Sequence, residues 1–140
     1  MIRPSRIVLL VLLVVAAVTM VGCGGRSSSF ALDGTEWRLA AWSVSSASAT
    51  DFEITLSFDD GIVGGQAPVN SYGGPYDARP DGTFRADSIS STLMAGEERA
   101  NSAEAAYLSL LQQVRRYAVD GDELTLSDAR GNQLLIFERQ

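Results

Sequence analysis

The 140-residue sequence has no histidine, no lysine and only one cysteine, and each shortage excludes a class of chemistry. Without histidine there is no Ser-His-Asp triad, no Cys-His pair and no imidazole ligand for a metal. A single cysteine permits neither an internal disulfide nor a multi-cysteine zinc site. These absences predict a protein that is not an enzyme and that holds no metal and no cofactor.

Positive charge is also scarce, because 11 arginines face 17 acidic residues and the formal net charge is −6. A protein that binds nucleic acid needs clustered positive charge to contact the phosphates, so we expect no nucleic-acid partner. The acidity also disfavours flat contact with anionic lipid headgroups. Attachment to a membrane would therefore have to come from an inserted group.

The first 22 residues carry the pattern of an export signal. Arg3 and Arg6 precede an uninterrupted stretch of 15 apolar or small residues, 7–21. As a helix this stretch would span about 22 Å at ~1.5 Å per residue, which is short of the ~30 Å hydrocarbon core of a bilayer. Its length and its flanks are those of the apolar region of a signal peptide.

The signal ends in Met20-Val21-Gly22-Cys23, which resembles the lipobox of bacterial lipoproteins, although Leu is commoner than Met at its first position. The resemblance implies cleavage before Cys23, with a diacylglyceryl group on its thiol. Two or more acyl chains hold a protein durably on a membrane, so the expected partner is the membrane and the expected place is its extracytoplasmic face. The alternative is an uncleaved N-terminal anchor with an incidental cysteine.

Three segments follow from this interpretation: a signal at 1–22, a flexible lipidated tether at 23–31 and one domain at 32–138. Removing the signal removes two arginines and no acid, so the mature charge is 9 − 17, or −8. The remaining chain, 140 − 22 or 118 residues, is long enough to bury about 65% of its unfolded surface. We expect a monomer.

Alternating apolar residues predict that the domain is mainly β, with strands at 34–42, 52–58, 83–89, 117–119, 123–127 and 133–138. In the first strand Trp37, Leu39 and Ala41 share the inner face, and Trp42 faces outward unless a bulge shifts it. Asp59-Asp60-Gly61 is a hairpin turn. The Gly/Pro-rich segment 64–76 predicts short, interrupted extended pieces.

One helix is predicted from about Ser102 to Arg115, with Asn101 as its cap and Glu104 as the capping-box partner. Its apolar stripe, which includes Tyr107 and Leu111, is typical of a core-facing helix. The last strand is apolar on both faces, which places it centrally or beneath the helix. The predicted fold class is α+β, a curved antiparallel sheet or partial β-barrel with a single α-helix packed on it.

Several motifs follow one another along the domain: Leu32-Asp33-Gly34-Thr35-Glu36-Trp37-Arg38-Leu39, the Gly-rich block 63–76, Ser91-Thr92-Leu93-Met94-Ala95-Gly96 and Glu104-Ala105-Ala106-Tyr107. In this order they resemble the META domains, also called the HslJ-like family of envelope proteins. The resemblance covers about residues 32 to 137. It implies a binding or stress-response module without an established reaction, since relatives include heat-induced lipoproteins tied to envelope stress.

Two positions depart from the family pattern together. Val69 stands where a Gly-Cys-Asn step has cysteine, and Gly96 stands where a Met-Ala-Cys step has cysteine. If these cysteines pair in relatives, this chain has lost both at once, and packing must replace a bridge worth about 2–5 kcal/mol. A redox role that depends on those cysteines does not extend to this member.

The candidate ligand groove consists of Asn70, Tyr72 and Tyr76, and its alternative is a bulged sheet corner with Tyr76 in the core. Trp37 and Trp42 offer a sugar-stacking platform, but Trp37 is more simply a core anchor.

The acidic runs 59–60 and 120–123 lack the spacing of calcium loops and fit turns. Glu97-Glu98 is read as a solvated run and not as a catalytic pair.

Three functional hypotheses remain. The first is a non-enzymatic envelope lipoprotein that binds an unknown envelope protein or small ligand. The second is a carrier of a small apolar ligand, which would need an open cavity between sheet and helix. The third is a hydrolase of glycan that uses carboxylates alone, which would need two facing carboxyl groups in a cleft.

Overall fold

The computed structural model describes residues 32–44 and 47–140. The predicted signal, Cys23 and the predicted tether lie outside these described residues. The elements are β1 (Thr35–Trp42), η2 (Ala49–Asp51), β2 (Thr55–Asp59), β3 (Ile62–Gln66), β4 (Ser71–Pro75), β5 (Asp77–Ala78), β6 (Phe84–Arg85), β7 (Ser90–Ser91), α1 (Glu98–Gln113), β8 (Arg116–Asp120), β9 (Glu123–Ser127) and β10 (Gln133–Arg139).

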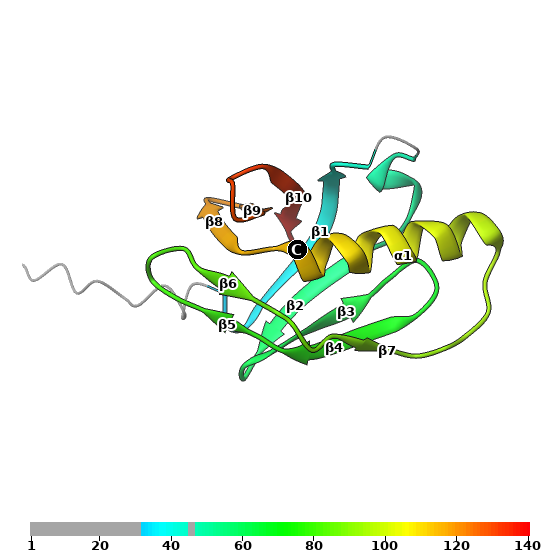
Figure 1. The fold of residues 1–140 in the computed structure, drawn as a ribbon, viewed down its shortest axis with the longest axis horizontal. Helices are drawn as coiled ribbons and strands as arrows, with labels where there is room; N and C mark the ends of the chain where they lie inside the picture. Colours follow the sequence, from blue (N-terminus) through cyan, green and yellow to red (C-terminus); the bar gives the residue numbers. More distant parts are fainter. Residues whose placement is uncertain (1–31, 45–46) are drawn as a thin grey trace, which may run out of the picture.

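Eight strands form one antiparallel sheet in the order β7-β4-β3-β2-β1-β10-β9-β8, and β5 pairs with β6 separately. The sheet curves around the single helix, as Figure 1 shows. It is not closed into a barrel, but the chain around β6 reaches β8, where the Phe84 amide donates to the Arg115 carbonyl at 2.9 Å. The predicted class, mainly β with one helix on a curved sheet, is confirmed.

A bulge in β1 changes which residues face the core. Trp37 and Leu39 are buried as predicted, but the pairing of β1 with β10 shifts between Leu39 and Ala41. The prediction that Ala41 faces inward is therefore wrong: Ala41 is exposed, and Trp42 is half-buried against the core. One extra residue in a strand reverses the alternation beyond it.

The Gly-rich segment forms two regular strands, β3 and β4, where the sequence predicted only interrupted pieces. The glycines allow close approach of neighbouring backbones, because a Cβ on Gly65 would lie 2.2 Å from the Thr55 carbonyl oxygen and one on Gly74 would lie 2.2 Å from that of Ser88. Of the strand predicted at 83–89, only the two residues of β6 are in a strand, and β7 begins after its predicted end.

The helix begins four residues earlier than predicted, at Glu98, and Asn101 is not its cap. Asn101 lies inside the first turn, where its side-chain amide donates back to the Gly96 carbonyl at 2.8 Å. The acidic side chain at the start of the helix suits the positive end of the helix dipole. Tyr107 and Leu111 are fully buried, which confirms the core-facing stripe.

The closing meander matches its prediction, and β10 lies between β1 and β9 in the middle of the sheet, as its two apolar faces predicted. Leu135 and Phe137 of β10 are fully buried. The part of the chain that the structure describes includes no helix of the length and apolarity needed to span a membrane.

Candidate functional site

A buried carboxylate joins the helix to the turn between β3 and β4. Glu104, only 8% exposed, accepts hydrogen bonds at Oε2 from the backbone amides of Val69 and Asn70, both at 2.7 Å. Its Oε1 accepts a third, at 2.6 Å, from the side-chain amide of Asn70. Glu104 is the one buried acid among the described residues, and all three contacts are with amide donors. This arrangement fixes the start of the helix against the sheet.

Asn70 also forms hydrogen bonds with the segment between β7 and the helix. Its Oδ1 accepts from the Thr92 hydroxyl at 2.8 Å and from the Met94 amide at 2.7 Å, and its Nδ2 also donates to the Met94 carbonyl at 3.4 Å. We call Asn70, Glu104 and these partners the polar hub. Buried groups satisfied in this way hold a unique geometry.

The segment held by the polar hub presents two apolar side chains to solvent. Leu93 is 95% exposed and Met94 is 61% exposed, and both follow β7 directly. Every residue from Thr92 to Arg99 is exposed. A pair of large apolar side chains on a chain segment fixed by hydrogen bonds is a surface feature that needs an explanation.

Tyr72 lies in the core and forms a chain of hydroxyls with Tyr107. The Tyr72 hydroxyl donates to the Thr55 carbonyl at 2.7 Å and lies 2.6 Å from the Tyr107 hydroxyl. A hydroxyl has one proton, so Tyr107 is the donor to Tyr72. Burial raises the pKa of both phenols, and the neighbouring Tyr107 adds to the rise in the pKa of Tyr72.

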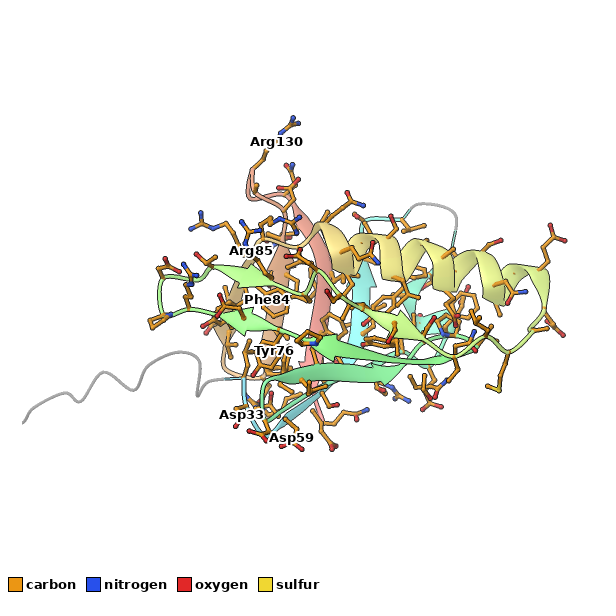
Figure 2. The ribbon with its side chains drawn as sticks, turned by 60° about the horizontal axis from the view of Figure 1, so that its bottom comes forward. Asp33, Asp59, Tyr76, Phe84, Arg85 and Arg130 are labelled. Carbon is orange, nitrogen blue, oxygen red and sulfur yellow. The ribbon has the colours of Figure 1, made fainter. Side chains whose placement is uncertain are left out.

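Tyr76 lies elsewhere, in a group of rings at the other end of the sheet. Its ring stands edge-on to Phe58 at 4.9 Å and stacks on Phe84 at 6.0 Å, and Phe84 in turn contacts Tyr117 at 6.4 Å. We call these four residues the aromatic cluster; Figure 2 labels Tyr76 and Phe84 within it. Partial burial raises the pKa of Tyr76.

The three residues of the predicted ligand groove are thus divided among the polar hub, the tyrosine pair and the aromatic cluster. One groove of the described structure lies beside the first half of α1. It has a volume of about 540 Å³, and its lining includes Trp42, Val44 and Ala47 on one side and Ser102, Ala103 and Ala106 on the other. Glu97, Glu98 and Arg99 also line it.

Val69 and Gly96, the two positions that depart together from the expected family pattern, lie in contact. A Cβ built on Gly96 would lie 3.0 Å from Val69 Cγ1 and 2.5 Å from Val69 Cγ2. The isopropyl group of Val69 therefore occupies the space next to Gly96, beside the polar hub. Packing joins the two segments here.

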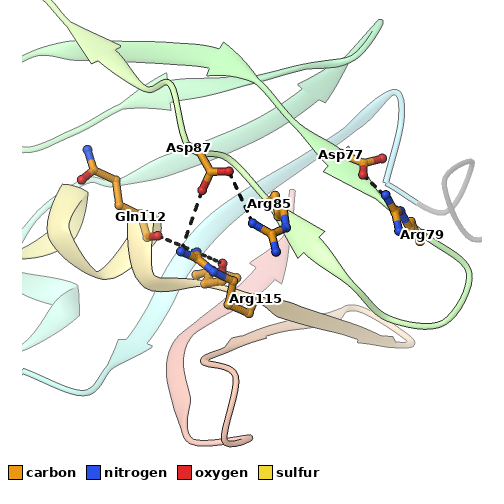
Figure 3. Close-up of polar contacts among 7 residues, drawn as sticks. Asp77, Arg79, Arg85, Asp87, Gln112 and Arg115 are labelled. Carbon is orange, nitrogen blue, oxygen red and sulfur yellow. Dashed lines mark hydrogen bonds and ion pairs between the residues drawn. The ribbon is translucent and has the colours of Figure 1, made fainter.

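Arginines near the end of the helix are tied to carboxylates and carbonyls (Figure 3). Arg115 donates to the carbonyls of Gln112 and Val114 at 2.7 Å each, which satisfies groups at the helix C-terminus. Asp87 lies 3.9 Å from both Arg85 and Arg115. Exposed pairs of this kind contribute about 0–1 kcal/mol, so their role is local.

A family model of the META domain matches residues 30–140. The chain belongs to the META domain family. The polar hub of this META domain is built from its motifs, because Asn70 comes from the Gly-rich block, Met94 from the segment before the helix and Glu104 from the helix itself.

Solved structures agree with the fold of this META domain. An NMR structure of a protein from Burkholderia xenovorans is 28% identical, with a TM-score of 0.66 over 81% of this chain and 86% of that one. A DUF4847 family protein from Bacteroides vulgatus ATCC 8482 is 14% identical, with a TM-score of 0.56 over 76% of this chain and 93% of that one, and so shows the fold alone. A comparison with curated proteins finds no match.

Sequence reasoning missed the exposed pair Leu93–Met94 and the buried position of Glu104. Glu104 was read as a capping residue because it lies three residues after Asn101. The available signal was its place on the Tyr107 side of the helix, where Ala103 and Glu104 share the buried face. No group of three or more potential metal-ligating side chains occurs within residues 32–44 and 47–140.

Proposed function

We propose that this META domain is a lipid-anchored binding or stress-response module on the extracytoplasmic face of a bacterial cell membrane. It acts by contact and not by catalysis. One observation carries the binding role: Leu93 and Met94 are held in solvent by a buried network of hydrogen bonds. Apolar surface kept in water at a fixed place is typical of interaction sites.

The geometry suits a tethered module. The described chain enters β1 at the end of the molecule where β5 and β6 lie, whereas α1 begins at the opposite end (Figure 1). A lipid on Cys23 would therefore hold the domain by one end and leave the start of α1 at the other end. Such an arrangement favours contact with a partner in the space beyond the membrane.

The alternatives have less support. The interface between sheet and helix, where a carrier would hold its ligand, is filled by buried side chains that include Trp37, Tyr107 and Leu111. A carboxylate hydrolase would use a carboxyl group in a cleft, whereas the buried Glu104 accepts three hydrogen bonds from the protein's own amides.

The anchor is tested by Cys23→Ala in cells fed a labelled fatty acid. We expect the label and the membrane association to be lost, while the protein remains folded and is found free in the extracytoplasmic space. Ser27→Ala, in the proposed tether, is the matched control and should change neither. Labelling that persists in Cys23→Ala would refute the lipid anchor.

A further inference from the structure

The surface at the start of α1 combines three features. The exposed pair Leu93–Met94 is followed three residues later by the acidic Glu97-Glu98, and these two glutamates line the groove together with Trp42 and Ala106. We call this combination the distal surface. Apolar, acidic and apolar features meet on it.

The acidic pair is available for an external partner. Both Glu97 and Glu98 are exposed, and neither carboxylate forms an ion pair within the described chain. By contrast, the neighbouring Arg99 is bound to Asp51 and lies over the Phe52 ring. The net charge of the distal surface is therefore negative.

We propose that the distal surface binds a basic amphipathic segment of another envelope protein. Apolar side chains of that segment would cover Leu93 and Met94 and enter the groove, and its Lys or Arg side chains would pair with Glu97 and Glu98. A groove of about 540 Å³ has the size of a typical binding site. The inference rests on the proposed binding role but is independent of the lipid on Cys23.

The charge pattern favours this occupant over a lipid surface. Anionic headgroups would meet two unpaired carboxylates, and the distal surface lies at the end of the molecule remote from the entry of the chain (Figure 1). A basic protein segment is attracted by the same carboxylates. Complementary charge and apolar contact then act on one partner.

The test is photocrosslinking in the intact cells that make the full chain, with p-benzoylphenylalanine at residue 93. Residue 62 is the control position, because Ile62 is also an exposed apolar residue, at 51%, but lies on β3. We expect a protein adduct from residue 93 alone. Mass spectrometry should place the crosslink in a segment that contains both Lys or Arg and apolar residues.

Charge reversal then tests the chemistry of the partner. Glu97→Arg/Glu98→Arg should lower the adduct yield at least about tenfold. The matched control is Asp120→Arg/Glu123→Arg, which changes the net charge equally on exposed residues of the β8–β9 hairpin and should leave the yield unchanged. Unfolding midpoints of all variants are compared to show that each is folded.

Filling the groove tests its part in the contact. Ala106→Gln places a longer neutral side chain in the groove and should also lower the yield, whereas Ala105→Gln, on an exposed position of the same helix, should not.

An adduct with lipid or with a second copy, a crosslink in a segment without basic residues, or a yield insensitive to Glu97 and Glu98 would overturn the inference and leave the anchor standing. Equal adducts from residues 62 and 93, or none, would overturn the binding role as well.

Discussion

The two ends of this META domain are held together by different kinds of interaction. At the end where β5 and β6 lie, the aromatic cluster fills the space with the rings of Phe58, Tyr76, Phe84 and Tyr117. At the end where α1 begins, the polar hub joins helix, turn and loop through hydrogen bonds to Asn70 and Glu104. One end is held by non-directional packing and the other by directional bonds.

The difference explains why the exposed surface lies where it does. Packing of rings hides apolar area and leaves little of it for a partner. Hydrogen bonds from a buried side chain to the backbone of a segment instead fix the path of that backbone. They do not require the side chains of the segment to be buried. Asn70 holds the backbone of Met94 from both its amide and its carbonyl, so the side chains of Leu93 and Met94 are free to face water.

The strongest contrast is expected from the same kind of replacement at each end. Glu104→Leu leaves the backbone amides of Val69 and Asn70 without acceptors and takes from Asn70 Nδ2 the shorter of its two hydrogen bonds, which costs about 4 kcal/mol of unfolding free energy. Phe84→Leu keeps an apolar side chain in an apolar site and costs about 1.5 kcal/mol. Urea unfolding of the purified variants measures both. Equal losses of unfolding free energy in the two variants would contradict the difference between the two ends.

The second prediction concerns a disulfide added beside the polar hub. In a Cys23→Ala background, Val69→Cys/Gly96→Cys should form a disulfide, because a Gly96 Cβ would lie 3.0 Å from Val69 Cγ1 and a disulfide sets a Cβ-to-Sγ distance of about 3 Å. Closing this loop should stabilise the protein by about 3 kcal/mol until a reductant is added. Thiol titration and urea unfolding with and without reductant measure it.

The control for the disulfide is Gly96→Ala alone. Its methyl group would lie 2.5 Å from Val69 Cγ2, so this variant should be less stable than the parent by about 1–3 kcal/mol. Free thiols that persist in the double variant under oxidising conditions would show that the two positions are not placed for a bridge.

The aromatic end was more readable from sequence than the polar end. Phe58 follows from strict alternation along its strand, and such alternation is visible in one sequence. Glu104 and Asn70 are 34 positions apart, and although the helix face of Glu104 indicates burial, no local pattern identifies the distant turn whose amides it binds. The helix start was misplaced because Asn101 and Glu104 fit a local capping rule, whereas Asn101 donates to the Gly96 carbonyl and Glu104 accepts from the turn between β3 and β4.

Strand geometry was limited in a similar way. The bulge that exposes Ala41 and half-buries Trp42 depends on pairing with β10, almost a hundred residues later in the chain. The glycines of β3 and β4 predicted interruption because their partners, Thr55 and Ser88, were unknown. Of the predicted groove, Tyr76 joined the aromatic cluster while Asn70 joined the polar hub, so residues close in sequence serve opposite ends.

The third prediction concerns how unfolding free energy depends on pH through the pair Tyr72 and Tyr107, which combines ring packing with hydrogen bonds. Burial raises the pKa of Tyr72 and Tyr107 above the ordinary value of about 10. The contribution of the two protonated phenols to the free energy of unfolding is therefore complete below pH 10 and is lost as pH rises toward the folded-state pKa values. We expect a loss of about 2–3 kcal/mol in unfolding free energy between pH 9 and 11.

Because the sequence has no lysine, few other groups titrate in this window. Tyr72→Phe/Tyr107→Phe should remove most of this loss and leave the smaller contribution of Tyr76, whose pKa partial burial also raises; a profile unchanged by the double substitution would assign the pH dependence to other groups.

The smallest effect expected is an asymmetry within that pair. Tyr107 donates to Tyr72, and Tyr72 donates to the Thr55 carbonyl. Tyr72→Phe therefore leaves a fully buried Tyr107 hydroxyl and a carbonyl without partners, at about 2 kcal/mol, whereas Tyr107→Phe removes one donor and leaves the bond to Thr55 intact, at about 1 kcal/mol. Urea unfolding at pH 7 measures both. The reverse order would mean that Tyr72 directs its proton to Tyr107 and not to the Thr55 carbonyl.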